Sequence, residues 1–328
     1  MTRVAAIDCG TNSIRLLVAD IVAEHATLRD VDRRMEIVRL GQGVDRTGRL
    51  APDAIQRTLA ACRRYARIIR DTGAEQIRFV ATSATRDVEN RADFVAGVRD
   101  ELGVEPEVIT GDEEAALSFA GATRELLAAG VEQPVLVVDI GGGSTEFVLG
   151  GWDADVGNSQ DGSQGGSAGR TTVRAARSVD IGCVRMTERH LHSDPPTEDE
   201  IAAARADIDA SISLAAETVA LAQTGTLVGL AGSVTTVAAM ALDLPSYLPE
   251  RIHHARIPAA DVHRVARRLL SMSHAERAAL PFMHPGRVDV IGAGALVLAA
   301  ILDRVPVDEV VVSEHDILDG IAFSLLTG

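Results

Sequence analysis

The sequence contains no lysine: all 32 basic residues among its 328 positions are arginine. A Walker A loop, a Schiff-base enzyme and a protein kinase with a lysine on its third strand each need an ammonium group, so these classes are excluded. Aromatic residues make up only 3% and the net charge is −15. These values exclude a base-stacking platform and a basic face for nucleic acid. The 46% of hydrophobic residues is nevertheless typical of a globular protein.

Cysteine is equally scarce. Cys9, Cys62 and Cys183 are odd in number and far apart, which excludes a disulfide framework and favours a reducing cytoplasm. The longest uncharged stretch, residues 218–242, is interrupted by glycine and polar residues, so it is not a membrane span. The first residues also lack the pattern of a signal peptide. We therefore expect a cytoplasmic protein without a membrane or nucleic-acid partner.

What the sequence does contain is an internal repeat. The segment VAAIDCGTNSIRLLV (4–18) aligns without a gap with VLVVDIGGGSTEFVL (135–149). Each copy is an apolar strand that ends in an aspartate (Asp8 or Asp139), a turn of small residues, and a second apolar strand. The two copies predict a β-hairpin in each half of a duplicated protein.

Strand and helix patterns alternate around these hairpins. Helices are predicted at 52–70, 89–102, 112–127, 197–222, 233–242, 259–272 and 287–303, and further strands at 35–40, 76–81, 106–110, 226–230 and 307–312. This alternation predicts an α/β protein with two domains and a cleft between them. The Gly/Ser/Gln-rich segment 157–169 is expected to be a flexible surface insertion.

The two hairpin turns have the composition of phosphate-binding nests, in which successive N–H groups and hydroxyls surround an anion. An ordinary turn needs no aspartate before it, so the recurrence favours binding over a purely structural role. Two further anion sites are predicted, at an arginine that follows a strand and at a glycine-rich helix start. The predicted phosphate-binding residues are Gly10, Thr11, Asn12, Ser13, Arg86, Gly141, Gly142, Gly143, Ser144, Thr145, Gly232 and Ser233.

Several carboxylates belong to the same prediction. Asp8 and Asp139 should face the turns, where a divalent cation such as Mg²⁺ must separate them from phosphate, and Glu146 on the returning strand is expected to join them. Glu114 lies in the helix start TGDEEA (110–115). An acid there either stabilises the helix terminus or orients and deprotonates a water, and the residues alone leave both roles open. The nine histidines are scattered and the pair at 253–254 has no partner cluster in the sequence, so no histidine metal site is predicted.

Taken together, these motifs resemble the exopolyphosphatase and guanosine pentaphosphate phosphohydrolase family, in its short, two-domain exopolyphosphatase form. The matching segments are 8–17, 81–90, 109–121, 139–147, 180–188, 229–240 and 287–302. The resemblance implies a duplicated actin-like fold of the hexokinase, Hsp70 and ribonuclease H type. Domain I would comprise residues 1–122 plus 305–328, and domain II residues 123–304.

The resemblance also implies roles for particular residues. The family's catalytic base falls on Glu114, its phosphate and Mg²⁺ residues on Asp139, Gly141 and Glu146, and its first phosphate loop on 10–13. A monovalent cation such as K⁺ and a homodimer are further implications. The segment SEHDILDG (313–320) departs from the family pattern, because Leu318 stands where the family has arginine.

The expected activity is Mg²⁺-dependent release of terminal orthophosphate from inorganic polyphosphate, with a preference for short chains. Within the family, the alternative is removal of the γ-phosphate of guanosine pentaphosphate. Outside it, a phosphotransferase or a non-catalytic nucleotide sensor on the same fold stays open, because a fold does not fix a function.

Overall fold

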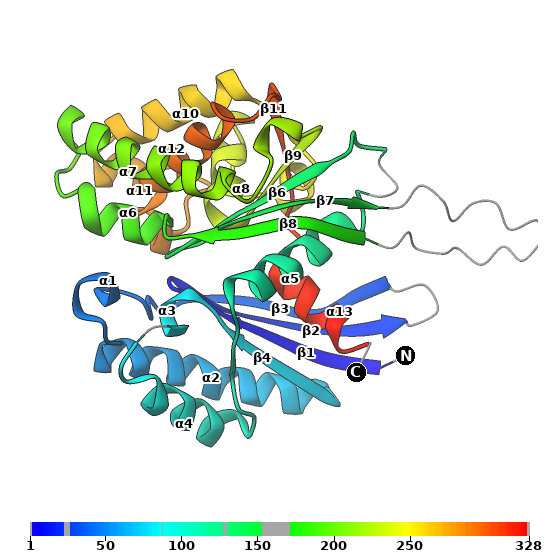
Figure 1. The fold of residues 1–328 in the computed structure, drawn as a ribbon. Coiled ribbons are helices and arrows are strands. Elements are labelled where there is room, and N and C mark those ends of the chain that lie inside the picture. The colour runs from blue at the N-terminus through cyan, green and yellow to red at the C-terminus, as the bar shows by residue number, and fades with distance from the viewer. Residues whose placement is uncertain (1, 23–26, 87, 127–129, 153–170, 327–328) are drawn as a thin grey trace, which may run out of the picture.

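Two β-sheets, each covered by helices, make up the protein (Figure 1). The structure, a computed structural model, describes residues 2–22, 27–86, 88–126, 130–152 and 171–326. The first sheet has the order β3-β2-β1-β4-β5 and the second β10-β11-β9-β6-β7-β8. The strands of the first are β1 (Thr2–Cys9), β2 (Ser13–Val22), β3 (Thr27–Ile37), β4 (Gln76–Ala81) and β5 (Glu107–Val108). Those of the second are β6 (Val135–Ile140), β7 (Thr145–Trp152), β8 (Thr171–Val179), β9 (Thr226–Leu230), β10 (Arg256–Pro258) and β11 (Glu309–Val312).

The two sheets repeat one topology. In each, three consecutive strands form an antiparallel meander, and the next strand returns to pair in parallel with the first of the three. Each sheet adds one more parallel strand next to the returning strand: β5 pairs with β4, and β11 pairs with β9. This repetition confirms the predicted α/β class and the duplicated actin-like fold. The predicted strand at 35–40 lies instead at Thr27–Ile37, because charged residues on this edge strand hide its apolar pattern.

Alternate residues of the central strands contact helices on opposite faces, as the two-residue period of a strand requires. In β1, Ala5 and Ile7 pack under α2 (Pro52–Thr72) and α4 (Arg91–Leu102), whereas Val4 and Ala6 face α13 (Ile317–Ser324). In β6, the even-numbered residues face a helical layer and the odd-numbered ones face α5 (Gly111–Thr123). That layer contains α7 (Glu198–Ala216), α8 (Ala231–Ala241), α10 (Ala259–Ser271) and α12 (Ile291–Leu302), with α6 (Cys183–His190) at its side.

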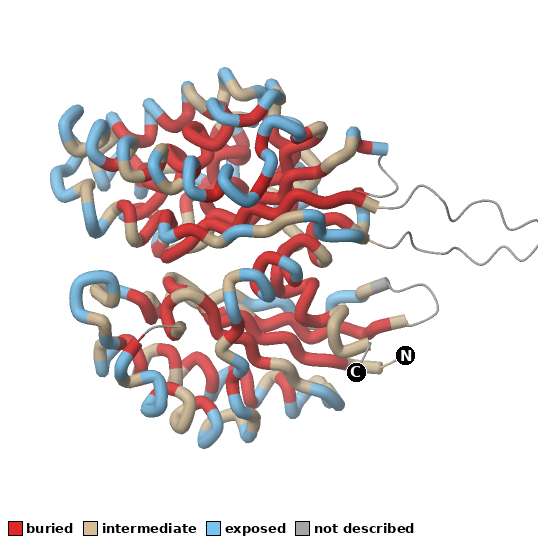
Figure 2. Tube along the Cα trace, viewed as in Figure 1, coloured by how far each residue is buried: buried red, intermediate tan, exposed pale blue. Residues whose placement is uncertain are grey.

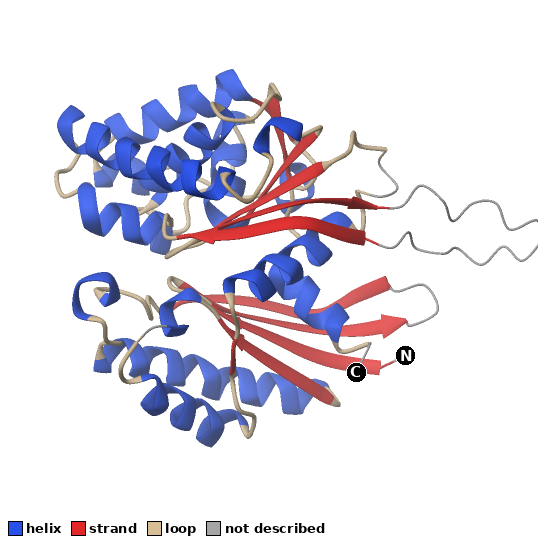
Figure 3. Ribbon diagram, viewed as in Figure 1, coloured by secondary structure: helices blue, strands red, loops and turns tan. Residues whose placement is uncertain are grey.

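Burial follows this layering (Figures 2 and 3): the central strands and the facing sides of the helices are buried, whereas β3, β8 and the outer helix faces are largely exposed or half-buried. The helix α12 is buried along its whole length, which explains why its sequence is apolar on every side. Short helices connect these elements: α1 (Val44–Thr47), α3 (Ser83–Arg86), α9 (Pro249–Ile252), α11 (His274–Ala278), and two 3₁₀ turns at Leu221–Gln223 and Pro285–Arg287. No helix among the described residues combines the length and apolar character needed to cross a membrane.

Helices α5 and α13 lie against each other between the two sheets (Figure 1). Their backbones touch, because a Cβ atom on Gly121 would overlap the carbonyl oxygen of Asp316 and one on Gly320 would overlap that of Leu117. Only glycine permits this approach.

The packing changes the expected domain division in two places. Helix α5 covers the second sheet through Ala115 and Phe119, and β11 pairs with β9 in that same sheet. A division by packing therefore assigns α5 and β11 to the second half, and the chain returns to the first half after Val312, not at 305. Helical periodicity shows that a helix has an apolar face but not which sheet covers it. With these changes the division stays a proposal, and the predicted insertion at 157–169 lies outside the described residues.

Candidate active site

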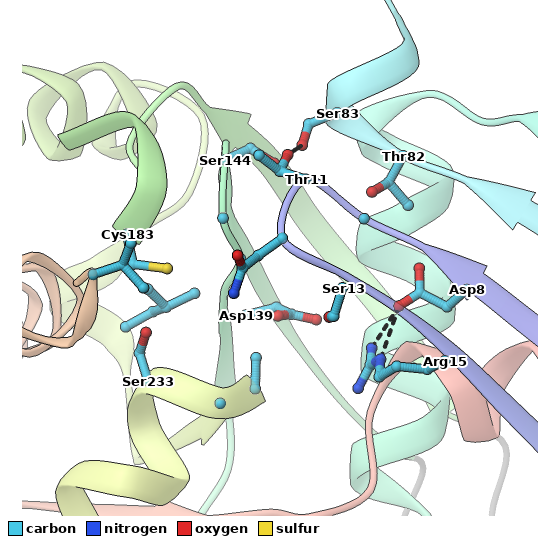
Figure 4. Close-up of a pocket in the computed structure, with 18 of the residues that line it drawn as sticks. Asp8, Thr11, Ser13, Arg15, Thr82, Ser83, Asp139, Ser144, Cys183 and Ser233 are labelled. Atoms are coloured by element: carbon cyan, nitrogen blue, oxygen red, sulfur yellow. Dashed lines mark hydrogen bonds and ion pairs between the residues drawn. The ribbon is translucent and has the colours of Figure 1, made fainter. Parts of the chain in front are cut away.

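The two repeated hairpin turns meet in one cleft of about 110 Å³ (Figure 4). Their close approach depends on Gly142, where an added Cβ would lie 2.9 Å from Cβ of Thr11. The helix start at Gly232 and the beginning of α5 complete the walls. The predicted site residues that line the cleft are Asp8, Gly10, Thr11, Asn12, Ser13, Glu114, Asp139, Gly141, Gly142, Ser144, Gly232 and Ser233. The fold thus gathers residues from four distant segments.

The other four predicted residues stand behind this lining. The Thr145 hydroxyl donates to the carbonyl of Ile181, so it is engaged in the fold and not turned to a ligand. An added Cβ on Gly143 would meet the Thr11 hydroxyl, which places this glycine at the contact between the turns. Arg86 and Glu146 lie next to residues of the lining, as the following contacts show.

Strand register makes the two hairpins chemically different. Asp8 pairs with Arg15 across the first hairpin, and at the corresponding positions of the second hairpin Asp139 pairs with Glu146. Nη2 of Arg15 lies 2.7 Å from Oδ2 of Asp8 (Figure 4). Nη1 of the same guanidinium contacts Asp316. One guanidinium therefore compensates Asp8, whereas the second hairpin places two carboxylates side by side.

Glu114 adds a third acid to this pair. It lies in the first turn of α5, and Nη2 of Arg86 donates to its Oε2 at 2.7 Å. The hydroxyl of Ser178 donates to Glu146 at 2.7 Å, and that of Ser118 donates to Asp139 at 2.8 Å.

All three acids are buried, and their ionisation is disfavoured. Burial, together with repulsion from Glu146, raises the pKa of Glu114 well above its usual range, although Arg86 opposes the shift. The same two causes raise the pKa of Asp139 to about 8, against the attraction of Arg15 and the Ser118 hydrogen bond. Burial also raises the pKa of Glu146. Among the described residues, the ion pair of Arg86 with Glu114 is the one ion pair that these three buried acids form. Three buried oxygen donors with so little compensating charge suit a small, hard dication such as Mg²⁺.

Sequence reasoning missed several residues of the site. The position of Arg15 could have been predicted from the sequence, because it lies as far after the first turn as Asp8 lies before it and so pairs with Asp8 across the hairpin. Ser118 and Ser178 have no local signal, since they reach the acids from α5 and β8. Arg287 was part of a matching segment without an assigned role; it packs against Gly232 and donates to Thr236 at 3.1 Å. Cys183 lines the cleft on the same side as Ser233, across from Asp8 (Figure 4).

The cleft continues into a second cavity of about 460 Å³ that shares Arg15, Gly232 and Arg287 with it. Arg33 and Arg34 of β3 also line this cavity. Glu314 and Asp316 are its acidic residues, so four arginines face two carboxylates. Leu318, at the position where the family has arginine, lies in the wall and is 1% exposed.

Known proteins share this sequence and fold along nearly the whole chain. The chain is 51% identical over 336 residues to exopolyphosphatase 2 of Mycobacterium tuberculosis, covering 99% of both chains. The crystal structure of an exopolyphosphatase-like protein matches with a TM-score of 0.90 and 43% identity, over 99% of this chain and 97% of that one. The Aquifex aeolicus PPX-GPPA enzyme matches with a TM-score of 0.76 and 30% identity, over 98% and 99%. The family profile described as the Ppx/GppA phosphatase family covers residues 17–327, and the chain belongs to this family.

Proposed function

We propose that this protein is an exopolyphosphatase, which hydrolyses the terminal phosphoanhydride bond of inorganic polyphosphate and releases orthophosphate. The observation that carries the proposal is the position of Glu114, which lines the same cleft as both phosphate-binding turns. The full-length similarity to the M. tuberculosis exopolyphosphatase supports the choice of substrate.

The terminal phosphate would bind between the two turns. Backbone N–H groups at 11–12 and 142–144 and the hydroxyls of Ser13 and Ser144 would donate to its oxygens, whereas the N–H groups of Gly10 and Gly141 close the two turns. Arg15 and Arg287 stand where the cleft opens into the arginine-lined cavity, so they would hold the next phosphates of the chain. These contacts position the phosphorus for in-line attack and stabilise the charge that develops on its oxygens.

We infer that Asp139 and Glu146, with Glu114 beside them, hold a Mg²⁺ ion. When bound, the ion supplies positive charge to the phosphate oxygens and offsets the repulsion that raises the pKa of Glu114. Asp8 is the weaker candidate ligand among the predicted acids, because Arg15 already binds it. Ionised Glu114 accepts a hydrogen bond from the attacking water and then its proton, while Arg86 fixes the carboxylate orientation.

The two connected cavities also favour short substrates. The arginines that we expect to bind phosphate line these two cavities, of about 110 and 460 Å³. Only the first few phosphates of a polymer would therefore contact them. We expect a higher initial rate on short polyphosphate than on chains of hundreds of units, compared at equal concentrations of chain ends.

The decisive experiment measures phosphate release from short polyphosphate, long polyphosphate, guanosine pentaphosphate and ATP side by side, with Mg²⁺ and with EDTA. The proposal expects the fastest release from short polyphosphate and none with EDTA. Faster release from guanosine pentaphosphate would assign the alternative substrate, and no release from any of the four would point to a phosphotransferase or sensor.

We also propose a homodimer. Light scattering should then give a mass of about twice the 34.6 kDa of one chain, and a single-chain mass would contradict this.

A further inference from the structure

Three histidines and one glutamate that are far apart in the sequence come together outside the active site. Glu125 lies in the turn after α5, His253 and His254 follow α9, and His315 lies between β11 and α13. Ligand atoms of Glu125, His253 and His315 all lie within 4.8 Å of one another. None of the four residues lines the catalytic cleft or the cavity that continues it. The expectation that the 253–254 pair lacks partners was therefore wrong, because the partners are supplied by the fold.

The hydrogen bonds of His253 show what its ring does. Its Nδ1 accepts the N–H of Glu314 at 3.1 Å, so in the neutral ring the proton is on Nε2. That Nε2 lies 2.8 Å from Oε2 of Glu125 and donates to it. A ring with this tautomer has no lone pair left for an ion, but it holds the Glu125 carboxylate in place. Histidine–carboxylate hydrogen bonds of this kind commonly orient metal ligands.

The other two imidazoles are placed to bind an ion together with that carboxylate. Nε2 of His254 lies 4.0 Å from Oε2 of Glu125, is buried, and has no hydrogen-bond partner. Nδ1 of His315 lies 3.6 Å from Oε1 of the same carboxylate. Ligand atoms around a tetrahedral Zn²⁺ are about 3.3 Å apart, given bonds of 2.0–2.1 Å, so the two imidazole–carboxylate separations exceed this value by about 0.3–0.7 Å.

The exposure of the carboxylate also suits coordination. Half of the Glu125 side chain is exposed, which leaves a path for an ion to enter.

We propose that Glu125, His254 and His315 form a binding site for a transition-metal dication such as Zn²⁺, with His253 as the residue that positions the carboxylate. Two imidazoles and a carboxylate favour Zn²⁺ over Mg²⁺, which prefers oxygen ligands, so this site and the catalytic acids should select different ions. The ligands come from the segment that follows α5, the segment that follows α9 and the segment that leads to α13. A bound ion would thus link these three segments.

The test is a calorimetric titration of the tag-free, EDTA-treated protein with Zn²⁺ in excess Mg²⁺, without substrate. We expect one Zn²⁺ per chain. His254→Asn and His315→Gln should each weaken binding by at least about 100-fold, and His253→Gln by about 10- to 100-fold, the range for loss of a positioning partner. Asparagine is chosen at 254 because it tolerates the positive φ of 61° there.

Two controls separate this site from others. His192→Gln removes an exposed histidine outside the cluster, and Asp139→Asn alters the catalytic acids; both should leave Zn²⁺ affinity unchanged. In a parallel melt, Zn²⁺ should raise the Tm of the parent but not that of Glu125→Gln, whose exposed position cannot disturb the core. Three results would overturn the proposal: no Zn²⁺ binding by the parent, binding as tight as the parent's in the three histidine variants of the cluster, or loss of binding in Asp139→Asn.

Discussion

Replacing Glu114 by glutamine tests the proposed catalytic base most directly. Glutamine keeps the side-chain shape and can still accept the hydrogen bond of Arg86, but it cannot take a proton from water. General-base catalysis typically contributes 10²- to 10⁴-fold, so kcat should fall by that factor, which is about 3–5 kcal/mol in the activation free energy. Binding of a short polyphosphate should survive, since one negative charge fewer near a polyanion lessens repulsion.

Glu113 provides the matched control. It precedes Glu114 in the same helix turn, but its side chain is 46% exposed and forms an ion pair with Arg78 at 2.8 Å. Loss of an exposed pair costs about 0–1 kcal/mol of stability, so Glu113→Gln should keep kcat within a few fold. The assay compares kcat by phosphate release with affinity for a short polyphosphate by calorimetry in both variants. If Glu113→Gln is the impaired enzyme, or Glu114→Gln turns over normally, the base is wrongly assigned.

Three further predictions concern the ion, the acids and the interhelical contact. EDTA should abolish phosphate release, and Asp139→Asn should require much more Mg²⁺; activity in EDTA would contradict the cation site. The pKa of Asp139 is raised on folding, so the charged form destabilises the fold progressively from about pH 4 up to about pH 8. Without Mg²⁺, the Tm gain of Asp139→Asn over the parent should therefore grow from pH 5 to pH 8 and then level off, and a gain that shrinks with pH would refute this. Gly121→Ala should lower the unfolding free energy by about 1–3 kcal/mol in a urea melt, because its Cβ meets backbone, whereas Gly97→Ala meets only the movable side chain of Leu59 and should cost much less.

The repeat made the centre of the fold predictable. Two apolar strands joined by small residues placed both hairpin turns correctly, because a hairpin is a local structure whose register follows from its turn. The same register would have revealed Arg15 opposite Asp8. Helix existence was also readable, but α12 begins at Ile291 instead of 287, where a 3₁₀ turn precedes it.

What the sequence could not show depends on contacts between distant segments. Apolar periodicity does not say that α5 covers the second sheet and α13 the first, since the central strands of both sheets are buried on both faces. The hydroxyls of Ser118 and Ser178 reach their acids only after packing. Likewise, His315 joins the histidines after α9 only because β11 pairs with β10 in the finished sheet.

The contact between α5 and α13 has a consequence for the order in which the chain folds. The apolar face of β1 that carries Val4 and Ala6 is covered by α13, which the ribosome makes only after the whole second sheet. Until then this face lacks the cover that α13 supplies, so the first sheet is made early and its packing is completed late. Such an intermediate is prone to aggregate, and chaperone contact should persist until α13 emerges. In the finished protein, the close contact between α5 and α13 links the two halves, so we expect them to unfold together.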